Sequence, residues 1–522
     1  MKAQLLIQSL LQRIVCFLLV LTGCFYANRS FAQRLQVNLQ YTVSMPRPAN
    51  HLFHIELQVN NWDKDTIDLK MPQWMPGYYQ LMNYANAVDH IVSNDIPLKK
   101  TSDNSWQLIT GKRKTFKLSY DVKADKQFVA NSYLDSTHAY LIPAGLFFHI
   151  NDHINTSVGV KIIPNKQWNK IATGLEPVAG KQYEFTAPDF DILYDCPILM
   201  GNLEELPSFK VKGIEHRFIG YKMADFDRVQ FMSNLQKVVE AAVNIIGDIP
   251  YKKYTFIGIG PGRGGIEHLN NTTVSFDGKG LNTAAGMNKI MNFLAHEYFH
   301  HYNVKRIRPY ELGPFNYDKG SKTNLLWVSE GLSVYYEYLI VKRAGLIKEE
   351  TLLADFESNI NAFENDPGRF FQSLTQASYE TWADGPFGRT DSVQDRSISY
   401  YDKGPVVGLL LDLTIRNATT GKKSLDDVMQ FLYWQYYKKL NRGFTDAEFQ
   451  QACETIAGIP LTTIFEYVYT VKDLDYNINL QYAGLKITMD ECSDKNKRKL
   501  SINRMENLTP AQLSMLHSWL GE

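Results

Sequence analysis

Apolar and polar residues alternate along short stretches of the first two hundred residues. In 35–43 and 54–59, every second side chain is apolar. A period of two is typical of strands that bury one face. Further strands are predicted at 116–122, 158–163 and 182–187, with turn residues between them and no long helical period. We therefore expect a β-sandwich-like N-terminal domain over residues 33–207.

The pattern becomes helical after Ala224. Between 226 and 246, apolar residues recur three and four positions apart, which predicts an amphipathic helix. Two strands, 254–259 and 272–276, are expected on either side of a glycine-rich loop. Further helices are predicted at 283–303, 324–344, 350–361, 403–416, 425–437 and 445–456. The predicted fold class is multidomain α+β, with a mostly helical domain over 208–482 and a short tail over 483–522.

Composition supports a globular protein of more than one domain. The chain has 522 residues, of which 44% are hydrophobic and 21% charged. This length exceeds what one core usually holds, and the balance is not that of a disordered chain. The formal net charge is zero, so nothing favours nucleic acid as a partner.

The first 32 residues have the pattern of an export signal. Lys2 and Arg13 lead into an apolar run, and Ser30-Phe31-Ala32 ends in the small-x-small pattern of a cleavage site. The run is too short for a comfortable permanent membrane span. An alternative is a lipobox at 21–24, in which Cys24 would carry a lipid anchor. Cleavage after Ala32 and lipidation at Cys24 both predict a periplasmic or extracellular protein.

The clearest chemical motif is His296-Glu-Tyr-Phe-His300, inside the predicted helix 283–303. Residues four apart lie on one face of a helix, so both imidazoles can reach one metal ion, and imidazole suits zinc. Glu297 would face the open coordination position and act as a general base. The alternative is a surface helix with two solvated histidines. The apolar residues around the motif argue against that alternative.

A third ligand is predicted on the next helix. Glu330 stands in an otherwise apolar stretch, where an unpaired carboxylate would be costly and a metal would remove the cost. Two histidines and one glutamate leave a position for water, as in catalytic zinc sites, so we expect one Zn²⁺ ion. Glu337 lies seven residues further on the same face. It would either orient a ligating histidine or be an ordinary surface carboxylate.

Two other segments offer groups for a substrate. Gly264 and Gly265, in the glycine-rich loop, permit close approach of the backbone to a ligand. Glu267 follows them and can bind a free α-amino group, or merely cap its own loop. Tyr401 opens the helix at 403–416 and can donate to an oxyanion, or simply pack at the helix start.

Together these segments resemble the glycyl aminopeptidase family of zinc metallopeptidases, the family sixty-one branch of the thermolysin-like gluzincins. The resemblance also covers 296–309, 327–336, 71–79 and 195–201. It implies a thermolysin-like catalytic domain and peptide substrates, with a preference for small N-terminal residues such as Gly or Ala. In the related aminopeptidase N and leukotriene-A hydrolase group, a Tyr-x-Lys-Gly tyrosine stabilises the oxyanion. A Gly-x-Met-Glu-Asn glutamate there binds the substrate amine. These positions match Tyr401 and Glu267.

The sequence also departs from the family pattern. His268 stands where the related group has Asn, so a zinc endopeptidase with the same chemistry is an alternative. A catalytically silent peptide-binding protein is a second alternative, and the presence of Glu297 argues against it. Relatives usually continue into a PDZ domain. We expect that domain to be missing or reduced to a stub within 483–522.

Overall fold

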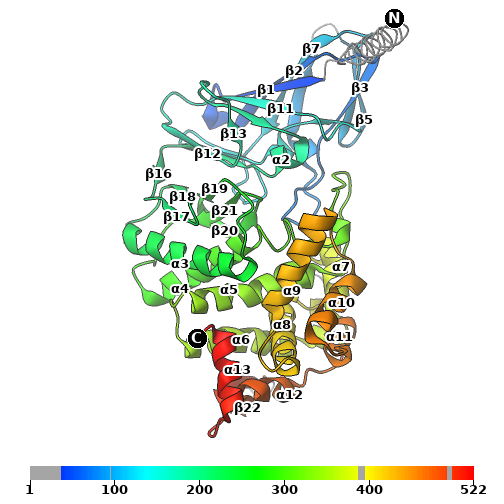
Figure 1. Ribbon diagram of the computed structural model, residues 1–522. Helices are drawn as coiled ribbons and strands as arrows, with labels where there is room; N and C mark the ends of the chain where they lie inside the picture. Colours follow the sequence, from blue (N-terminus) through cyan, green and yellow to red (C-terminus); the bar gives the residue numbers. More distant parts are fainter. Residues whose placement is uncertain (1–36, 94–95, 386–393, 491–496) are drawn as a thin grey trace, which may run out of the picture.

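The computed structural model describes residues 37–93, 96–385, 394–490 and 497–522 (Figure 1). The predicted leader, with Cys24, lies outside the described residues. Strands gather at one end of the molecule and helices at the other, as Figure 1 shows. The predicted order of a β-rich N-terminal region followed by a helical region is therefore confirmed.

The N-terminal region is built from three sheets within the described residues. The largest has the order β13-β14-β11-β1-β2-β7-β4, and the others are β10-β3-β6-β5 and β12-β15-β9-β8. Alternate residues of β2 (Leu52–Asn60) are buried, from Phe53 to Val59, because one face of the strand packs on the core. The other strands are β1 (Asn38–Ser44), β3 (Thr66–Lys70), β4 (Val88–Val92), β5 (Leu98–Ser102), β6 (Ser105–Ile109), β7 (Thr115–Lys123), β8 (Tyr133–Leu134), β9 (His138–Leu141), β10 (His149–Ile150), β11 (Val158–Ile163), β12 (Lys170–Thr173), β13 (Glu176–Pro177), β14 (Glu184–Ala187) and β15 (Ile198–Gly201).

A further sheet joins the β region to the helices. Its order is β16-β18-β19-β21-β20, with β17 paired to β18. The strands are β16 (Leu203–Glu205), β17 (Phe209–Val211), β18 (Ile214–Tyr221), β19 (Lys253–Gly258), β20 (Gly260–Glu267) and β21 (Asn271–Phe276). The glycine-rich segment predicted as a loop is thus the edge strand β20. Its pairing with β21 shifts register between Gly260 and Gly265, so the intervening residues bulge from the sheet.

The helices form the lower part of the molecule in Figure 1. They are α3 (Arg228–Ile246), α4 (Ala284–Phe299), α5 (Leu332–Arg343), α6 (Glu349–Glu364), α7 (Leu374–Asp384), α8 (Tyr400–Ala418), α9 (Leu425–Leu432), α10 (Asp446–Ala457), α11 (Thr462–Tyr469), α12 (Tyr476–Leu480) and α13 (Pro510–Leu520), while the short α2 (Phe190–Tyr194) belongs to the β region. None of the helices in the described ranges combines the length and apolar character that crossing a membrane requires.

Two helices differ from the prediction where the chemistry lies. The helix predicted over 283–303 ends at Phe299, because the chain turns and the Nδ1 of His300 meets the carbonyl oxygen of Asn303, 2.8 Å away. The helix predicted over 324–344 begins as a π-helical turn, Trp327–Gly331, before α5. Such widened turns often occur at functional sites.

A glycine contact brings this π-helical turn against α8. A Cβ atom built on Gly331 would lie 2.7 Å from the Cα of Gly404 and 2.9 Å from the carbonyl oxygen of Tyr400. Real Cβ atoms do not come this close, so the two backbones can touch only because both positions are glycine. The crossing places the start of α8 beside Glu330.

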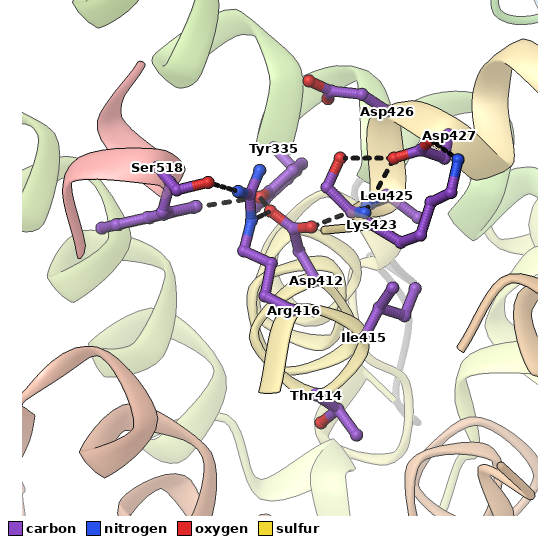
Figure 2. Close-up of polar contacts among 12 residues, drawn as sticks. Tyr335, Asp412, Thr414, Ile415, Arg416, Lys423, Leu425, Asp426, Asp427 and Ser518 are labelled. Carbon is purple, nitrogen blue, oxygen red and sulfur yellow. Dashed lines mark hydrogen bonds and ion pairs between the residues drawn. The ribbon is translucent and has the colours of Figure 1, made fainter. Parts of the chain in front are cut away.

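The last described segment packs on the helices of the helical region. It forms the hairpin β22 (Leu485–Asp490) and β23 (Lys499–Arg504), followed by α13. From α13, the Trp519 indole donates to the Tyr335 hydroxyl at 3.1 Å, and Ser518 accepts from Arg416 at 2.7 Å. Asp412 accepts from both Tyr335 and Arg416, as Figure 2 shows. These bonds connect α13 to α5 and α8.

Candidate metal centre and active site

Three side chains from two helices converge on one point. His296 is on α4, His300 is its C-terminal cap residue, and Glu330 is on the π-helical turn. The Nε2 atoms of the two histidines are 2.9 Å apart. Glu330 Oε2 lies 3.2 Å from His300 Nε2 and 3.6 Å from His296 Nε2. All three residues are buried, and they form a group that can hold a metal ion.

The hydrogen bonds behind the imidazoles show that this group fits a cation. His300 Nδ1 faces the carbonyl oxygen of Asn303 at 2.8 Å, and a carbonyl can only accept, so Nδ1 carries the proton. His296 Nδ1 lies 2.8 Å from Glu337 Oε2, and this close carboxylate favours a proton on the same ring nitrogen, although the geometry is not that of a hydrogen bond. Both Nε2 atoms then direct lone pairs at each other and at a carboxylate. A zinc ion, which imidazole and carboxylate ligands suit, would relieve this repulsion.

Asn303 and Ser333 support the metal-binding residues, and the spacing of the motif did not predict either of them. Asn303 Nδ2 donates to the carbonyl oxygens of Val328 and Ser329 at 2.8 and 3.1 Å, which ties the end of the metal helix to the turn carrying Glu330. Ser333 lies 3.3 Å from His300 Nδ1. The only sequence signal for Asn303 was its place in the segment 296–309, which resembles the family. Such outer contacts fix ring orientation and ligand basicity.

Glu297 is placed to act as a base beside the metal group. Its side chain is buried, and burial raises its pKa to about 7, with the two imidazoles opposing the rise. A base with this pKa exchanges protons readily near neutral pH. A Cβ on Gly265 would lie 2.5 Å from the Glu297 carboxyl carbon, so only glycine lets β20 pass so close. Gly264, with φ of 85°, lies in the bulge of β20.

The two neighbouring tyrosines at the start of α8 have different partners. The Tyr401 hydroxyl donates to Glu330 Oε2 at 2.9 Å, whereas the Tyr400 hydroxyl lies 3.1 Å from Thr381. Burial, followed by the charge of Glu330, raises the pKa of Tyr401 well above its ordinary value. Tyr401 is therefore a neutral phenol that can donate a hydrogen bond at the metal group.

Glu267 ends β20 with a carboxylate that is not fully paired. The residue is 4% exposed, and Oε1 has no hydrogen-bond partner among the described residues. A buried carboxylate oxygen without a donor is costly and favours a cationic ligand. The structure thus brings Glu267 and Glu297 to the same strand, because Glu267 ends β20 and the Glu297 carboxyl group lies against Gly265 of β20.

A buried ion pair connects the N-terminal region to the residues that follow Glu267. Asp195 Oδ1 lies 2.5 Å from Lys305 Nζ and 3.2 Å from His268 Nδ1, and Oδ2 accepts from the Leu269 backbone at 2.7 Å. Burial tends to raise the pKa of Asp195, but Lys305 and His268 hold it below its usual value. The carboxylate therefore anchors the residues that follow Glu267.

Comparison with known proteins agrees with this arrangement. Residues 40–202 match the family model described as the peptidase M61 N-terminal domain, and residues 289–407 match that of M61 glycyl aminopeptidase. Together the matches span more than half of the chain. No curated protein matches the sequence.

Solved structures share the fold. An aminopeptidase N family protein from Idiomarina loihiensis is 25% identical, with a TM-score of 0.82 over 88% of this chain and 80% of that one. An M1 zinc metallopeptidase from Deinococcus radiodurans is 14% identical, with a TM-score of 0.50 over 84% and 95%. Yeast LTA4 hydrolase in complex with bestatin is 13% identical, with a TM-score of 0.50 over 87% and 71%.

The fold and the two-histidine, one-glutamate group, with a buried glutamate beside them, define a zinc metallopeptidase of the aminopeptidase class. Within that class, the chain belongs to the M61 glycyl aminopeptidase family.

Proposed function

We propose that this protein is an exported aminopeptidase that removes small N-terminal residues, such as Gly or Ala, from peptides. The observation that carries exopeptidase action is the buried, unpaired Oε1 of Glu267 beside the metal group. A free α-amino group supplies the positive charge and the N–H donors that this oxygen lacks. An internal peptide bond supplies neither the charge nor a second donor.

His296, His300 and Glu330 would hold the zinc ion. When bound, zinc polarises the scissile carbonyl and lowers the pKa of an adjacent water. Glu297 accepts the proton of the attacking water at its carboxylate and then donates it to the leaving amine, as its pKa of about 7 permits. The protons balance over the catalytic cycle, because the Glu297 carboxylate is deprotonated again once it has donated the proton to the leaving amine.

The remaining groups position the substrate. The Tyr401 hydroxyl donates to the oxygen of the carbonyl as negative charge develops on it. Glu267 accepts from the α-amino group, which sets the first residue with its carbonyl toward the metal group. The edge strand β20 leaves one side free of strand partners among the described residues, so a peptide can lie along it.

Two further parts of the proposal rest on sequence. Export is supported by the leader pattern ending at Ala32, with cleavage there or lipidation at Cys24 as the two routes. The preference for a small first residue is supported by the description of the matching family model as a glycyl aminopeptidase.

The test uses the purified protein with free and N-acetylated peptides. Glu297→Gln should abolish hydrolysis of free-amine peptides while zinc content stays at one ion per chain. Glu240→Gln, on α3, is the matched control and should leave both unchanged. Hydrolysis by the Glu297→Gln variant at the wild-type rate would refute the mechanism. Equal wild-type rates on free and N-acetylated peptides would refute exopeptidase action.

A further inference from the structure

A segment of the N-terminal region reaches into the metal site. It runs from Trp74 to Gln80 and is fixed to the catalytic region by the Trp74 indole, which donates to the carbonyl oxygen of Asn316 at 2.7 Å. The Trp74 ring also packs edge-on against Trp382 of α7, with centroids 5.0 Å apart. The segment is therefore held at a defined place between the two regions.

Gly77 brings this segment against the carboxylate of Glu267. A Cβ atom on Gly77 would lie 3.0 and 3.1 Å from the two Glu267 oxygens and 2.6 Å from Ile266 Cγ2. Its φ of 99° is also a conformation that side chains rarely adopt. The backbone at Gly77 thus packs directly against the Glu267 carboxylate, which we propose binds the α-amino group of the substrate.

Tyr79 belongs to the same segment and packs against the helical region. Its side chain is 5% exposed, and its ring meets Trp382 edge-on at 6.2 Å. Burial, and after it the charges of Glu330 and Glu267, raise the pKa of Tyr79 well above its ordinary value. The phenol is therefore neutral.

The position of a substrate follows from these two carboxylates. In an aminopeptidase, the α-amino group meets Glu267 and the carbonyl meets the group that includes Glu330. Both substituents belong to one Cα atom, so the side chain of the first residue leaves the backbone between them. Tyr79 lies on this side of the site, because Gly77, two residues before it, meets the Glu267 oxygens. Its ring meets Trp382, whose neighbour Thr381 contacts Tyr400.

We propose that Tyr79 is a specificity-determining residue that closes the subsite for the first substrate residue and excludes large side chains. The assignment rests on the proposed aminopeptidase function. It adds that the N-terminal region supplies the wall, so selection of small residues belongs to contacts between the two regions rather than to the metal helices alone. The ring, rather than the hydroxyl, provides the exclusion.

The experiment compares Tyr79→Ala and Tyr79→Phe with the wild type on Gly-, Ala- and Leu-anilides. Tyr79→Ala should raise the ratio of kcat/KM for Leu over Gly by about tenfold or more, as pocket size changes typically do. Tyr79→Phe keeps the ring and should leave the ratio unchanged. Tyr78→Ala is the matched control, because that ring packs against Phe128 at 5.3 Å, within the β region.

A purely structural role would lower kcat/KM for all substrates together. An unchanged ratio in Tyr79→Ala therefore overturns the assignment. If that variant fails to fold, Tyr79→Leu removes the ring but keeps an apolar side chain for packing, and an unchanged ratio there overturns the assignment too. A readout without turnover is the Kd of Gly-Ala and Leu-Ala, measured calorimetrically on the Glu297→Gln background. Only Leu-Ala binding should tighten on adding Tyr79→Ala, and equal shifts would contradict the proposal.

Failure of the proposed function gives a different result. In that case the wild type would not cleave Gly-anilide, or would cleave it no faster than an N-acetylated peptide. If the wild type cleaves Gly-anilide well and only the Tyr79 variants show no change in ratio, the assignment of Tyr79 fails while aminopeptidase function stands.

Discussion

The contact between Gly331 and Gly404 predicts that Gly331→Ala damages catalysis without removing a reacting group. The new Cβ would meet backbone atoms, the Cα of Gly404 at 2.7 Å and the carbonyl oxygen of Tyr400 at 2.9 Å. Backbone cannot rotate away as a side chain can. The start of α8 and the π-helical turn must therefore move apart.

The size of this movement follows from the distances. Ordinary van der Waals contact begins at 3.4 Å, so the backbones must separate by about 0.7 Å. The Tyr401 hydroxyl is 2.9 Å from Glu330, and a shift of this size takes it beyond hydrogen-bonding distance. Overpacking of this kind costs about 1–3 kcal/mol of stability. Misplacement of a catalytic group by nearly 1 Å lowers kcat by about tenfold to a hundredfold.

The assay is kcat on Gly-anilide, with zinc content and thermal unfolding measured on the same preparation. Gly408→Ala, on α8 itself, is the matched control. Its nearest contact is Leu332 Cδ2 at 2.8 Å, the end of a side chain that can adjust. We expect Gly331→Ala to keep most of its zinc and lose kcat, with a smaller loss for Gly408→Ala. A kcat within twofold of wild type for Gly331→Ala would show that the glycine crossing does not position Tyr401.

Three other variants test separate parts of the site. Asp195→Ala leaves the Lys305 ammonium buried without its partner, which should cost about 3–5 kcal/mol in urea unfolding. Because the folded pKa of Asp195 is below its unfolded value of about 3.9, its contribution is present above that pH and is lost as the pH falls through the folded pKa. The wild type should therefore lose stability below pH 4 more steeply than Asp195→Ala. Glu337→Gln should weaken zinc binding by about 10- to 100-fold in a chelator competition. Tyr401→Phe should lower kcat by about 100- to 1000-fold with little change in zinc content.

For each of these three predictions, one experimental result would contradict it. Equal unfolding free energies at pH 7 for Asp195→Ala and wild type would mean that solvent reaches Lys305. Unchanged zinc affinity in Glu337→Gln would make that contact incidental. Full activity in Tyr401→Phe, with loss in Tyr400→Phe instead, would exchange the roles of the two tyrosines.

The metal group could be predicted from sequence because helix geometry fixes it locally. Four residues separate His296 from His300, and this spacing alone puts both rings on one side of α4. Glu330 could be found because a lone carboxylate in an apolar stretch needs a partner. The alternating pattern likewise predicted the strands of the N-terminal region, since it reports directly which face is buried.

Contacts between distant segments leave no such pattern. The sequence predicts a loop where the structure has the edge strand β20, because glycines dominate the segment and its pairing depends on β21 and a bulge. The approach of Tyr79 to Glu330 joins residues about 250 positions apart. The sequence positions of Gly331 and Gly404 do not indicate that they meet, and their contact is visible only in the structure. The resemblance of 71–79 to the family was the one available signal for Tyr79.

The bonds from α13 have a consequence for how the enzyme matures. Ser518 and Trp519 hold Arg416 on α8 and Tyr335 on α5, the helices that continue into Tyr401 and Glu330 (Figure 2). During synthesis, His296 and His300 leave the ribosome long before α13 does. A growing chain can therefore expose its first two metal ligands while the other half of the site still lacks its final support. We expect hydrolysis to begin only after α13 has been synthesised and has packed on α5 and α8.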